Sequence, residues 1–454
     1  MSHSEKLGSD PIPRLLWQQA LPASIGILVM SIYGIVDTIF VGRYVGTLAI
    51  GAITVVLPIT YLIASIGMAI GIGGASIISR AMGGGSPQRA FRVFGNQATL
   101  TMIFVIVAVG LGLVFQDQVL QLFGGKGDIL PAARSYFRII LLGVPFLAWA
   151  MMANNVIRAE GAPKIAMMVM LVPAVVNLIL DPILIIGLEM GLEGAAWATT
   201  ISYICSALFT LWFFFSGKSE LQLRLHSLVL DSAIVREIFS LGSVTLARQS
   251  VISILSIVLN NSLFLYGGEQ AISVYGIIQR VMMFALFPVL GITQGFLPIA
   301  GFNYGAQKWE RVRNVINLSL KSGTAIAVFL FVLIITFTET IVSLFTIDAE
   351  LIRTAVPALR YSFLATPLIL IPLIGSAYFQ AIGKAVPALF LTLTKQGFCL
   401  IPLLLILPPV IGLDGIWFAF PIADILSAGI CFYFLRKETQ HLRAEGAALV
   451  PSRN

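Results

Sequence analysis

The segment Ser216–Glu237, SGKSELQLRLHSLVLDSAIVRE, is the most polar internal stretch of the chain. Long apolar runs, interrupted by Gly, Pro and charged residues, lie on both sides of it. At about 20 apolar residues per membrane crossing, each side has room for six spans. The segment therefore divides the chain into two halves of similar size.

The composition is typical of a chain that lies almost wholly in a membrane. Of 454 residues, 58% are hydrophobic and 11% are charged, against roughly 25% charged residues in an average soluble domain. These values exclude an ordinary soluble protein. The lack of short alternating segments excludes a β-barrel, so the expected fold is all-α and integral to the membrane.

Hydrophobic periodicity predicts twelve transmembrane helices in two six-helix lobes. The predicted spans cover residues 15–40, 48–76, 94–115, 135–157, 165–187, 194–216, 238–266, 272–301, 315–337, 356–381, 386–410 and 415–435. The corresponding regions are an N-terminus (1–13), a first lobe (14–216), a linker (217–237), a second lobe (238–435) and a tail (436–454).

Loop charges predict the orientation of these spans. Eighteen Lys and Arg residues, among them Lys6 and Arg453, fall on the side of the termini, and four fall on the other side. Because cytoplasmic loops are rich in Lys and Arg, both termini are expected in the cytoplasm. The net charge of +7 is then a consequence of topology. No basic stripe is interleaved with aromatic residues, so no nucleic-acid partner is expected.

The two halves match each other at a shift of 222 residues. The coinciding pairs include Gly46 and Gly268, Arg138 and Arg360, Pro145 and Pro367, and Gly161 and Gly383. Because each half has an even number of spans, the two repeats have the same orientation in the membrane. Two parallel six-helix bundles with a cleft between them are typical of a transporter.

Ionisable side chains inside spans are functional candidates, because each costs about 2.5 to 3.5 kcal/mol at a span centre. The first half has Asp37, which shares one helical face with Met30 and Tyr33. A thioether, an aromatic ring and a carboxylate on one face suit an amphipathic organic cation. Ordinary helix packing is the alternative for Met30 and Tyr33, and a structural hydrogen bond is the alternative for Asp37.

A second acid, Asp181, lies in the fifth predicted span, four residues after Asn177. The two side chains face the same way and offer oxygen ligands for Na⁺ or a site for a proton. Thr199 adds a hydroxyl group that would complete such a site. Because Asp181 precedes Pro182, a purely structural role at a helix break is the alternative.

Pro22 lies about four turns before Asp37 and predicts a hinge in the first span, since proline removes a backbone hydrogen bond. The second half lacks corresponding acids, and its membrane charges are Arg248, Arg280, Lys395 and Asp424. We expect Lys395 and Asp424 to pair, and Arg280 is a candidate for facing the cleft.

Two glycine motifs are not phosphate loops. The motif Gly71–Gly74 lies in an apolar span, where small residues allow close helix packing. Gly83–Gly85 lacks the Lys-Ser/Thr of a P-loop. Because no nucleotide-binding domain is apparent, ATP-powered transport by this chain is excluded, and no cofactor is expected.

In these features the sequence resembles the multidrug and toxic compound extrusion (MATE) family, in its DinF/MepA-like branch of bacterial and archaeal transporters. The similarity covers residues 14–435 and is carried by Asp37–Gly42, Gly85–Arg92 with its counterpart Gly305–Arg313, Ala159–Gly161, and Asn177 with Asp181.

The resemblance implies two lobes around a V-shaped cleft in the bacterial or archaeal plasma membrane, and antiport of cationic or amphipathic compounds against H⁺ or Na⁺. It places the coupling site at Asp37, Asn177, Asp181 and Thr199, with Tyr136 and Asn154 nearby as substrate contacts. We expect a monomer that is not an enzyme.

Two alternatives remain at this level. A flippase for a lipid-linked oligosaccharide would share the architecture, and Arg280 is the residue that favours it. An intramembrane enzyme would need a His or paired catalytic acids in the membrane, whereas His3, His226 and His441 lie outside the predicted spans.

Overall fold

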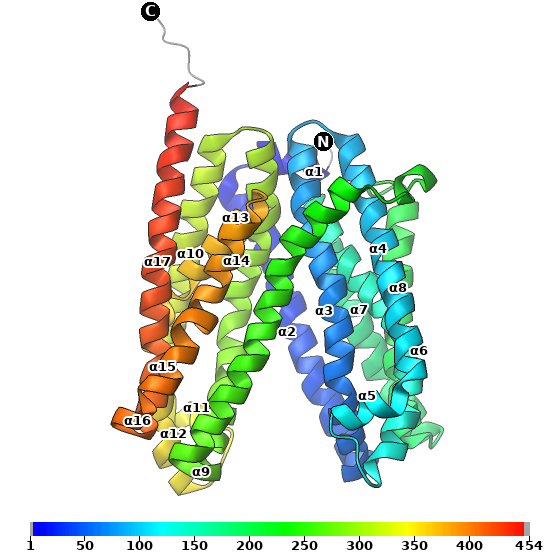
Figure 1. The fold of residues 1–454 in the computed structure, drawn as a ribbon, viewed down its shortest axis with the longest axis vertical. Coiled ribbons are helices and arrows are strands. Elements are labelled where there is room, and N and C mark those ends of the chain that lie inside the picture. Colours follow the sequence, from blue (N-terminus) through cyan, green and yellow to red (C-terminus); the bar gives the residue numbers. More distant parts are fainter. Residues whose placement is uncertain (1–2, 449–454) are drawn as a thin grey trace, which may run out of the picture. The chain divides into compact units, whose positions relative to one another are not determined.

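The computed structural model describes residues 3–448, which form helices joined by short loops and contain no β-strand (Figure 1). Ten of these helices are long and apolar enough to cross a membrane. A further pair, Ala349–Leu368 with Leu370–Ala381, meets the same criterion as one span bent by 46°. Arg453 and the ends of both predicted termini, 1–2 and 449–454, lie outside the described residues.

The elements follow one another as a series of long helices with short helices at their ends. Those of the first half are α1 (His3–Ser9), α2 (Ile12–Tyr44), α3 (Thr47–Gly83), α4 (Pro87–Val114), α5 (Gln116–Leu122), α6 (Ile129–Ala159), α7 (Pro163–Asp181), η1 (Pro182–Gly187), α8 (Gly191–Phe215) and η2 (Leu225–Leu228). Those that follow are α9 (Ser232–Gly305), α10 (Trp309–Thr336), α11 (Thr338–Ser343), α12 (Ala349–Ser362), η3 (Thr366–Leu368), α13 (Leu370–Ala381), α14 (Ala385–Leu393), η4 (Thr394–Leu400), α15 (Ile401–Ile406), α16 (Pro408–Ile411) and α17 (Leu413–Ala448).

Helix α9 represents two predicted spans rather than one. It contains 74 residues, and a straight helix of that length would extend about 110 Å, far more than the hydrocarbon core of a bilayer. Its backbone leaves the helical region at Gly268, where φ is 63° and ψ is −159°. With α9 counted as two spans and the bent pair as one, each of the twelve predicted spans has its helix.

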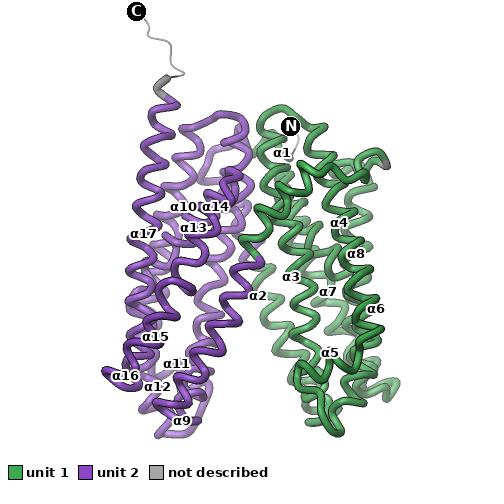
Figure 2. Tube along the Cα trace, viewed as in Figure 1, with its two compact units in different colours: residues 1–7, 25–245 green, residues 8–24, 246–454 purple. Residues whose placement is uncertain are grey.

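The chain forms two compact units (Figure 2). Unit 1 comprises residues 1–7 and 25–245, and unit 2 comprises residues 8–24 and 246–454. These units differ from the predicted lobes in two places: the first part of α9, up to Thr245, belongs to unit 1, and the first part of α2 belongs to unit 2. It packs closely on α9: a Cβ added at Gly291 would lie 2.8 Å from the carbonyl oxygen of Ala20, and one at Gly295 would lie 2.8 Å from its nitrogen.

The predicted linker, residues 217–237, belongs to unit 1. The Asn96 side chain of α4 accepts a hydrogen bond from the backbone N–H of Asp231 at 2.8 Å and donates one to the carbonyl of Val229 at 3.1 Å. These polar contacts explain why a segment with the composition of a linker has a fixed place in the unit.

Close packing between α3 and α6 confirms the interpretation of the glycine-rich span. A Cβ added at Gly67 would lie 2.6 Å from the carbonyl oxygen of Ala148, and one at Gly71 would lie 2.9 Å from Cα of Met152. No larger residue fits at these positions without moving a helix. An apolar core of unit 1 lies further along the same two helices, from Ala49 to Ile63 on α3 and from Ala133 to Val144 on α6.

The internal repeat is visible in the described structure of both units. Helices α4 and α10 begin and end 222 residues apart. In unit 1 the Arg138 guanidinium donates to Gln116 at 3.0 Å, and in unit 2 the matching Arg360 donates to Thr338 at 3.3 Å. Each of these arginines therefore anchors the short helix that follows the third span of its half.

Candidate functional site

Asp181 lies at the end of α7 with Asn177 one turn before it. Their exposed fractions are 3% and 0%. The chain does not break after Asp181 but continues through Pro182 as the π-helical segment η1, and the Asp181 side chain makes no capping hydrogen bond. The structural alternative of a helix cap is therefore not realised. Widened π-helical turns frequently lie at functional sites.

The Asn177 amide orients the Asp181 carboxyl group. In the orientation that satisfies both of its polar atoms, its nitrogen donates to Oδ2 of Asp181 at 2.7 Å. Its oxygen accepts from the backbone N–H of Thr199 on α8 at 3.3 Å. Asn177 thus connects α7 with α8 and positions one carboxylate oxygen.

Asp37 of α2 completes a pair of acids. The side chains of Asp37 and Asp181 lie within hydrogen-bonding reach of each other, so the structure brings the two predicted acids together. Oδ1 of each residue is buried and has no hydrogen-bond partner within residues 3–448. Two carboxylates in contact repel each other strongly away from water. A proton or a cation is therefore needed to neutralise the pair.

Tyrosine side chains surround the two acids. Tyr33 and Tyr136 lie close enough to interact with the charges of both Asp37 and Asp181, and Tyr136 also hydrogen-bonds Thr199. Aromatic rings next to carboxylates form an environment that attracts organic cations. Tyr33 and Tyr136 thus lie near both acids, and their part in substrate binding stays a prediction.

Two further tyrosines near Asp37 were not predicted, namely Tyr203 and Tyr61. Tyr203 is four residues after Thr199 on α8, so helical spacing alone could have identified it. Tyr61 belongs to α3, and no spacing in the sequence relates it to Asp37.

Other predicted site residues are not brought to this pair. The Asn154 side chain donates to the carbonyl of Ala166 at 2.6 Å and accepts from the Arg158 guanidinium at 3.0 Å. Met30 is half-buried on α2, one turn before Tyr33, and Arg280 is exposed on α9 in unit 2.

The predicted hinge residue, Pro22, is buried within α2. It lies in the part of α2 that belongs to unit 2, three residues before unit 1 resumes at Ile25. The proline therefore stands close to the point at which this helix passes from one unit to the other.

The predicted ion pair between Lys395 and Asp424 forms in unit 2, with a distance of 2.5 Å between Nζ and Oδ1. Lys395 belongs to the π-helical segment η4, and Asp424 belongs to α17. Their side chains are 22% and 7% exposed. Each charge is thus compensated by its partner.

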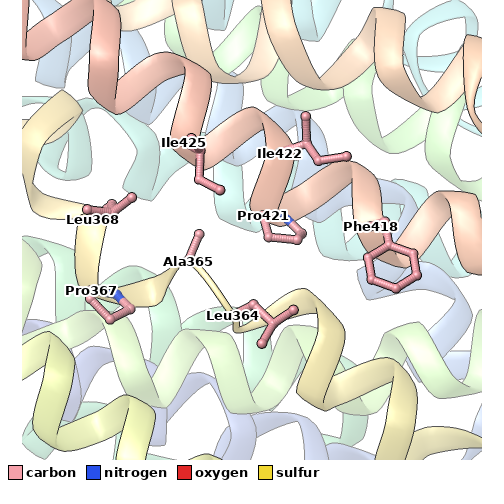
Figure 3. Close-up of a pocket in the computed structure, with 8 residues that line it drawn as sticks. All are labelled: Leu364, Ala365, Pro367, Leu368, Phe418, Pro421, Ile422 and Ile425. Atoms are coloured by element: carbon pink, nitrogen blue, oxygen red, sulfur yellow. The ribbon is translucent and has the colours of Figure 1, made fainter.

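An apolar pocket of about 310 Å³ lies in unit 2 beside the bend between α12 and α13. Figure 3 shows Leu364, Ala365, Pro367 and Leu368 on the bend, with Phe418, Pro421, Ile422 and Ile425 on α17. Its lining contains no charged residue, so it offers space for an apolar group only.

Comparison with known proteins identifies the family of this chain. The MatE family model matches residues 22–183 and 243–406. The multidrug export protein MepA of Staphylococcus aureus is 30% identical over 435 residues, covering 94% of this chain and 95% of its own length. MepA of Staphylococcus saprophyticus is 29% identical and covers 94% of each chain.

Solved structures show the same fold. The structure of a MATE protein in complex with MaL6 has a TM-score of 0.91 and 25% identity, covering 98% of this chain and 100% of its own. A MOP superfamily transporter from Pyrococcus furiosus has a TM-score of 0.90 and 25% identity, covering 98% of this chain and 99% of its own.

Apolar helices in two repeats, with the acids Asp37 and Asp181 together in unit 1, define a multi-pass membrane transporter rather than an enzyme. The match of the family model extends over both repeats, and the MepA relatives align with almost the whole chain. This chain belongs to the MatE family.

Proposed function

We propose that this chain is a multidrug efflux antiporter that exports cationic or amphipathic organic compounds in exchange for H⁺ or Na⁺. The observation that carries the proposal is the contact between Asp37 and Asp181, each with one buried oxygen that lacks a partner within residues 3–448. The multidrug export proteins among its relatives support drugs as the substrates.

Export of the organic cation and entry of the ion would be coupled because both compete for Asp37 and Asp181. An H⁺ or Na⁺ ion that enters from outside neutralises the pair and removes the attraction for an organic cation held against the tyrosines. The membrane potential drives inward return of the ion with about 2.3 kcal/mol per charge per 100 mV. Empty acids then attract the next cation from the cytoplasm.

Asn177 and Thr199 would hold the Asp181 carboxylate in place during this exchange. For Na⁺, the carboxylate oxygens and the Thr199 hydroxyl are ligands of the required type. For H⁺, the contact between the two acids is itself a site where one proton is shared. Bending of α2 near Pro22 would transmit the change of charge to the helix.

We place the transporter in a bacterial or archaeal plasma membrane as a monomer, with both termini in the cytoplasm and no cofactor. The excess of Lys and Arg in the loops on the side of the termini supports the orientation. A flippase for a lipid-linked oligosaccharide is less favoured, because a pyrophosphate would be repelled by Asp37 and Asp181.

Uptake of a fluorescent organic cation into proteoliposomes tests the proposal, with a pH gradient and a Na⁺ gradient imposed separately. We expect one gradient to drive movement in the wild type and neither to do so in Asp37→Asn. The matched control is Asp117→Asn, which changes an acid of unit 1 that is paired with Arg134 away from the site. Movement driven by neither gradient in the wild type, or wild-type rates in Asp37→Asn, would contradict antiport through this pair.

A further inference from the structure

A second, polar cavity lies in unit 1, outside the paired acids. Its volume is about 440 Å³. The lining comes from the first turns of α4 and α9 and the residue before α9: Gln88, Arg89, Arg92, Asp231, Ala233, Ile234 and Glu237. None of these residues has a part in the proposed transport.

The lining of this cavity carries two arginines and two acids, and Arg80, which is paired with Glu237 outside the lining, adds a third arginine. Glu237 is bound by both Arg80 at 3.0 Å and Arg89 at 2.8 Å, so one carboxylate faces two guanidinium groups. Asp231 caps α9, since its Oδ1 accepts from the backbone N–H of Ala233 at 2.9 Å. Across residues 3–448, the Arg92 guanidinium makes no hydrogen bond or ion pair. Arg92 is therefore a cation in the cavity lining that no acid of the described residues binds.

The backbone adds to this positive potential. Helix α4 begins at Pro87, and the preceding Ser86 makes no side-chain capping hydrogen bond. Gln88 and Arg89 lie in that first turn, where the helix dipole favours an anion. The two arginines and the helix end thus act in the same direction.

The internal repeat shows what kind of group such a position takes. At the shift of 222 residues, Arg89 corresponds to Arg311 in the first turn of α10. In unit 2, Arg311 donates to the carbonyl oxygen of Asp10 at 2.7 Å, and Lys308 donates to that of Gly8 at 2.8 Å. Oxygen atoms of the chain itself bind the cations there. In unit 1 the counterpart Arg89 binds the carboxylate of Glu237 instead, and the lining cation left without an oxygen partner among residues 3–448 is Arg92.

The position of the cavity along α4 indicates which anions can reach Arg92. Beyond Arg92 the helix exposes large apolar side chains: Met102, Ile103, Phe104, Ile106 and Val107. Exposed apolar residues on a membrane-spanning helix face lipid, so the cavity lies at the end of the span, at the level of the lipid headgroups.

We propose that this cavity binds a phosphate group, and that its source is the headgroup of an anionic phospholipid. Arginine binds phosphate oxygens with paired N–H donors, which Arg89 and Arg92 provide from one helix. The bound phosphate connects α4 with the start of α9. Inorganic phosphate has the same chemistry, so the test separates the two sources.

Thermal unfolding of the purified full-length protein in a neutral detergent is the first measurement. Phosphatidylglycerol, phosphatidylcholine and inorganic phosphate are added separately. We expect phosphatidylglycerol to raise the unfolding temperature of the wild type, phosphatidylcholine to leave it unchanged, and inorganic phosphate to act only weakly. A shift of equal size with inorganic phosphate would overturn the lipid as the source. The absence of a shift with both phosphatidylglycerol and inorganic phosphate would overturn the site.

Variants of the arginines locate the effect. Because a hydrogen bond to a charged group contributes about 1.5 to 3 kcal/mol, Arg92→Gln should weaken phosphatidylglycerol binding roughly 10- to 100-fold, and Arg89→Gln/Arg92→Gln should abolish the shift. Arg134→Gln, which changes an arginine paired with Asp117 elsewhere in unit 1, is the matched control and keeps the wild-type shift.

A second measurement covers the case in which a variant is less stable. Native mass spectrometry counts the phosphatidylglycerol molecules retained by each protein, whatever its unfolding temperature. Retention of the same number by the wild type and by the double variant would overturn the proposal. The double variant should still transport in proteoliposomes, because the substitutions do not touch the paired acids Asp37 and Asp181. This result distinguishes the phosphate site from the paired acids.

Discussion

The hydroxyl group of Ser219 donates a hydrogen bond to Oε2 of Glu160 at 2.7 Å, and the Glu160 side chain is fully buried. Glu160 follows the last residue of α6. Burial raises the pKa of its carboxyl group to about 8, the nearby charge of Glu220 adds to the increase, and the hydrogen bond from Ser219 opposes it. Oε1 has no partner in the described part of the chain. The protonated form is therefore the stable one in folded unit 1.

This carboxyl group predicts a loss of stability as pH rises. Its pKa is about 8 in the folded protein against an ordinary value of 4.5, so its contribution is complete below pH 4.5 and is lost as pH rises to about 8. In Glu160→Gln the side chain still accepts from Ser219 and cannot ionise. We expect the unfolding temperature of this variant to be nearly independent of pH over that range.

The measurement is thermal unfolding in detergent at a series of pH values. Glu220→Gln, which changes an acid whose side chain is not fully buried, is the control and should keep most of the wild-type slope. If Glu160→Gln shows the same slope as the wild type, another group is responsible.

Asn177→Ala should change binding of the coupling ion roughly 10- to 100-fold, because the substitution removes the donor that lies 2.7 Å from Asp181 and a hydrogen bond to a charged group contributes about 1.5 to 3 kcal/mol. If the coupling ion is Na⁺, its apparent affinity should fall, since the carboxylate is no longer oriented. If it is H⁺, the affinity should rise, since the lost donor stabilised the charged carboxylate. The dependence of transport rate on H⁺ or Na⁺ concentration measures it. Asn155→Ala serves as the control, since the Asn155 amide donates to Met151 of its own helix. An unchanged ion dependence in Asn177→Ala would show that the amide has no part in coupling.

The ion pair in unit 2 should have a structural role. Asp424→Leu leaves the ammonium group of Lys395 without its partner, and such a loss costs about 3 to 5 kcal/mol. In Lys395→Met/Asp424→Leu no charge remains, so we expect stability close to the wild type and transport that persists. Unfolding temperatures of Lys395→Met, Asp424→Leu and the double variant measure the interaction between the two side chains. Loss of transport in a stable double variant would instead assign the pair to transport.

Pro22→Ala should slow transport without lowering the unfolding temperature. Alanine restores a backbone hydrogen bond and is the better helix former, so the unfolding temperature should stay equal or rise. Because a straighter α2 bends less readily, transport should become slower while binding of the coupling ion is retained. Pro58→Ala, at an exposed proline within α3, is the matched control. Wild-type transport rates in Pro22→Ala would exclude the hinge.

Local patterns predicted most of the fold correctly. Each of the twelve apolar runs corresponds to one long helix, to part of α9 or to a series of shorter helices such as α12 and α13. This agreement is expected because apolar length and glycine or proline breaks act over neighbouring residues. The repeat was equally accessible, and the paired contacts of Arg138 and Arg360 bear it out. The continuation of α17 to Ala448 was not predicted, because its last part is polar and lacks the signal of a span.

The sequence by itself determined the membrane fold, the two repeats and the acids Asp37 and Asp181, since rare charges in apolar runs are visible without a structure. Tertiary structure alone decided that Tyr61 lies near Asp37 and that residues 8–24 belong to unit 2. It also decided that Arg89 faces a cavity where Arg311 meets backbone oxygens. The physical reason is that contacts between helices depend on how each helix is rotated and packed, which no local periodicity specifies.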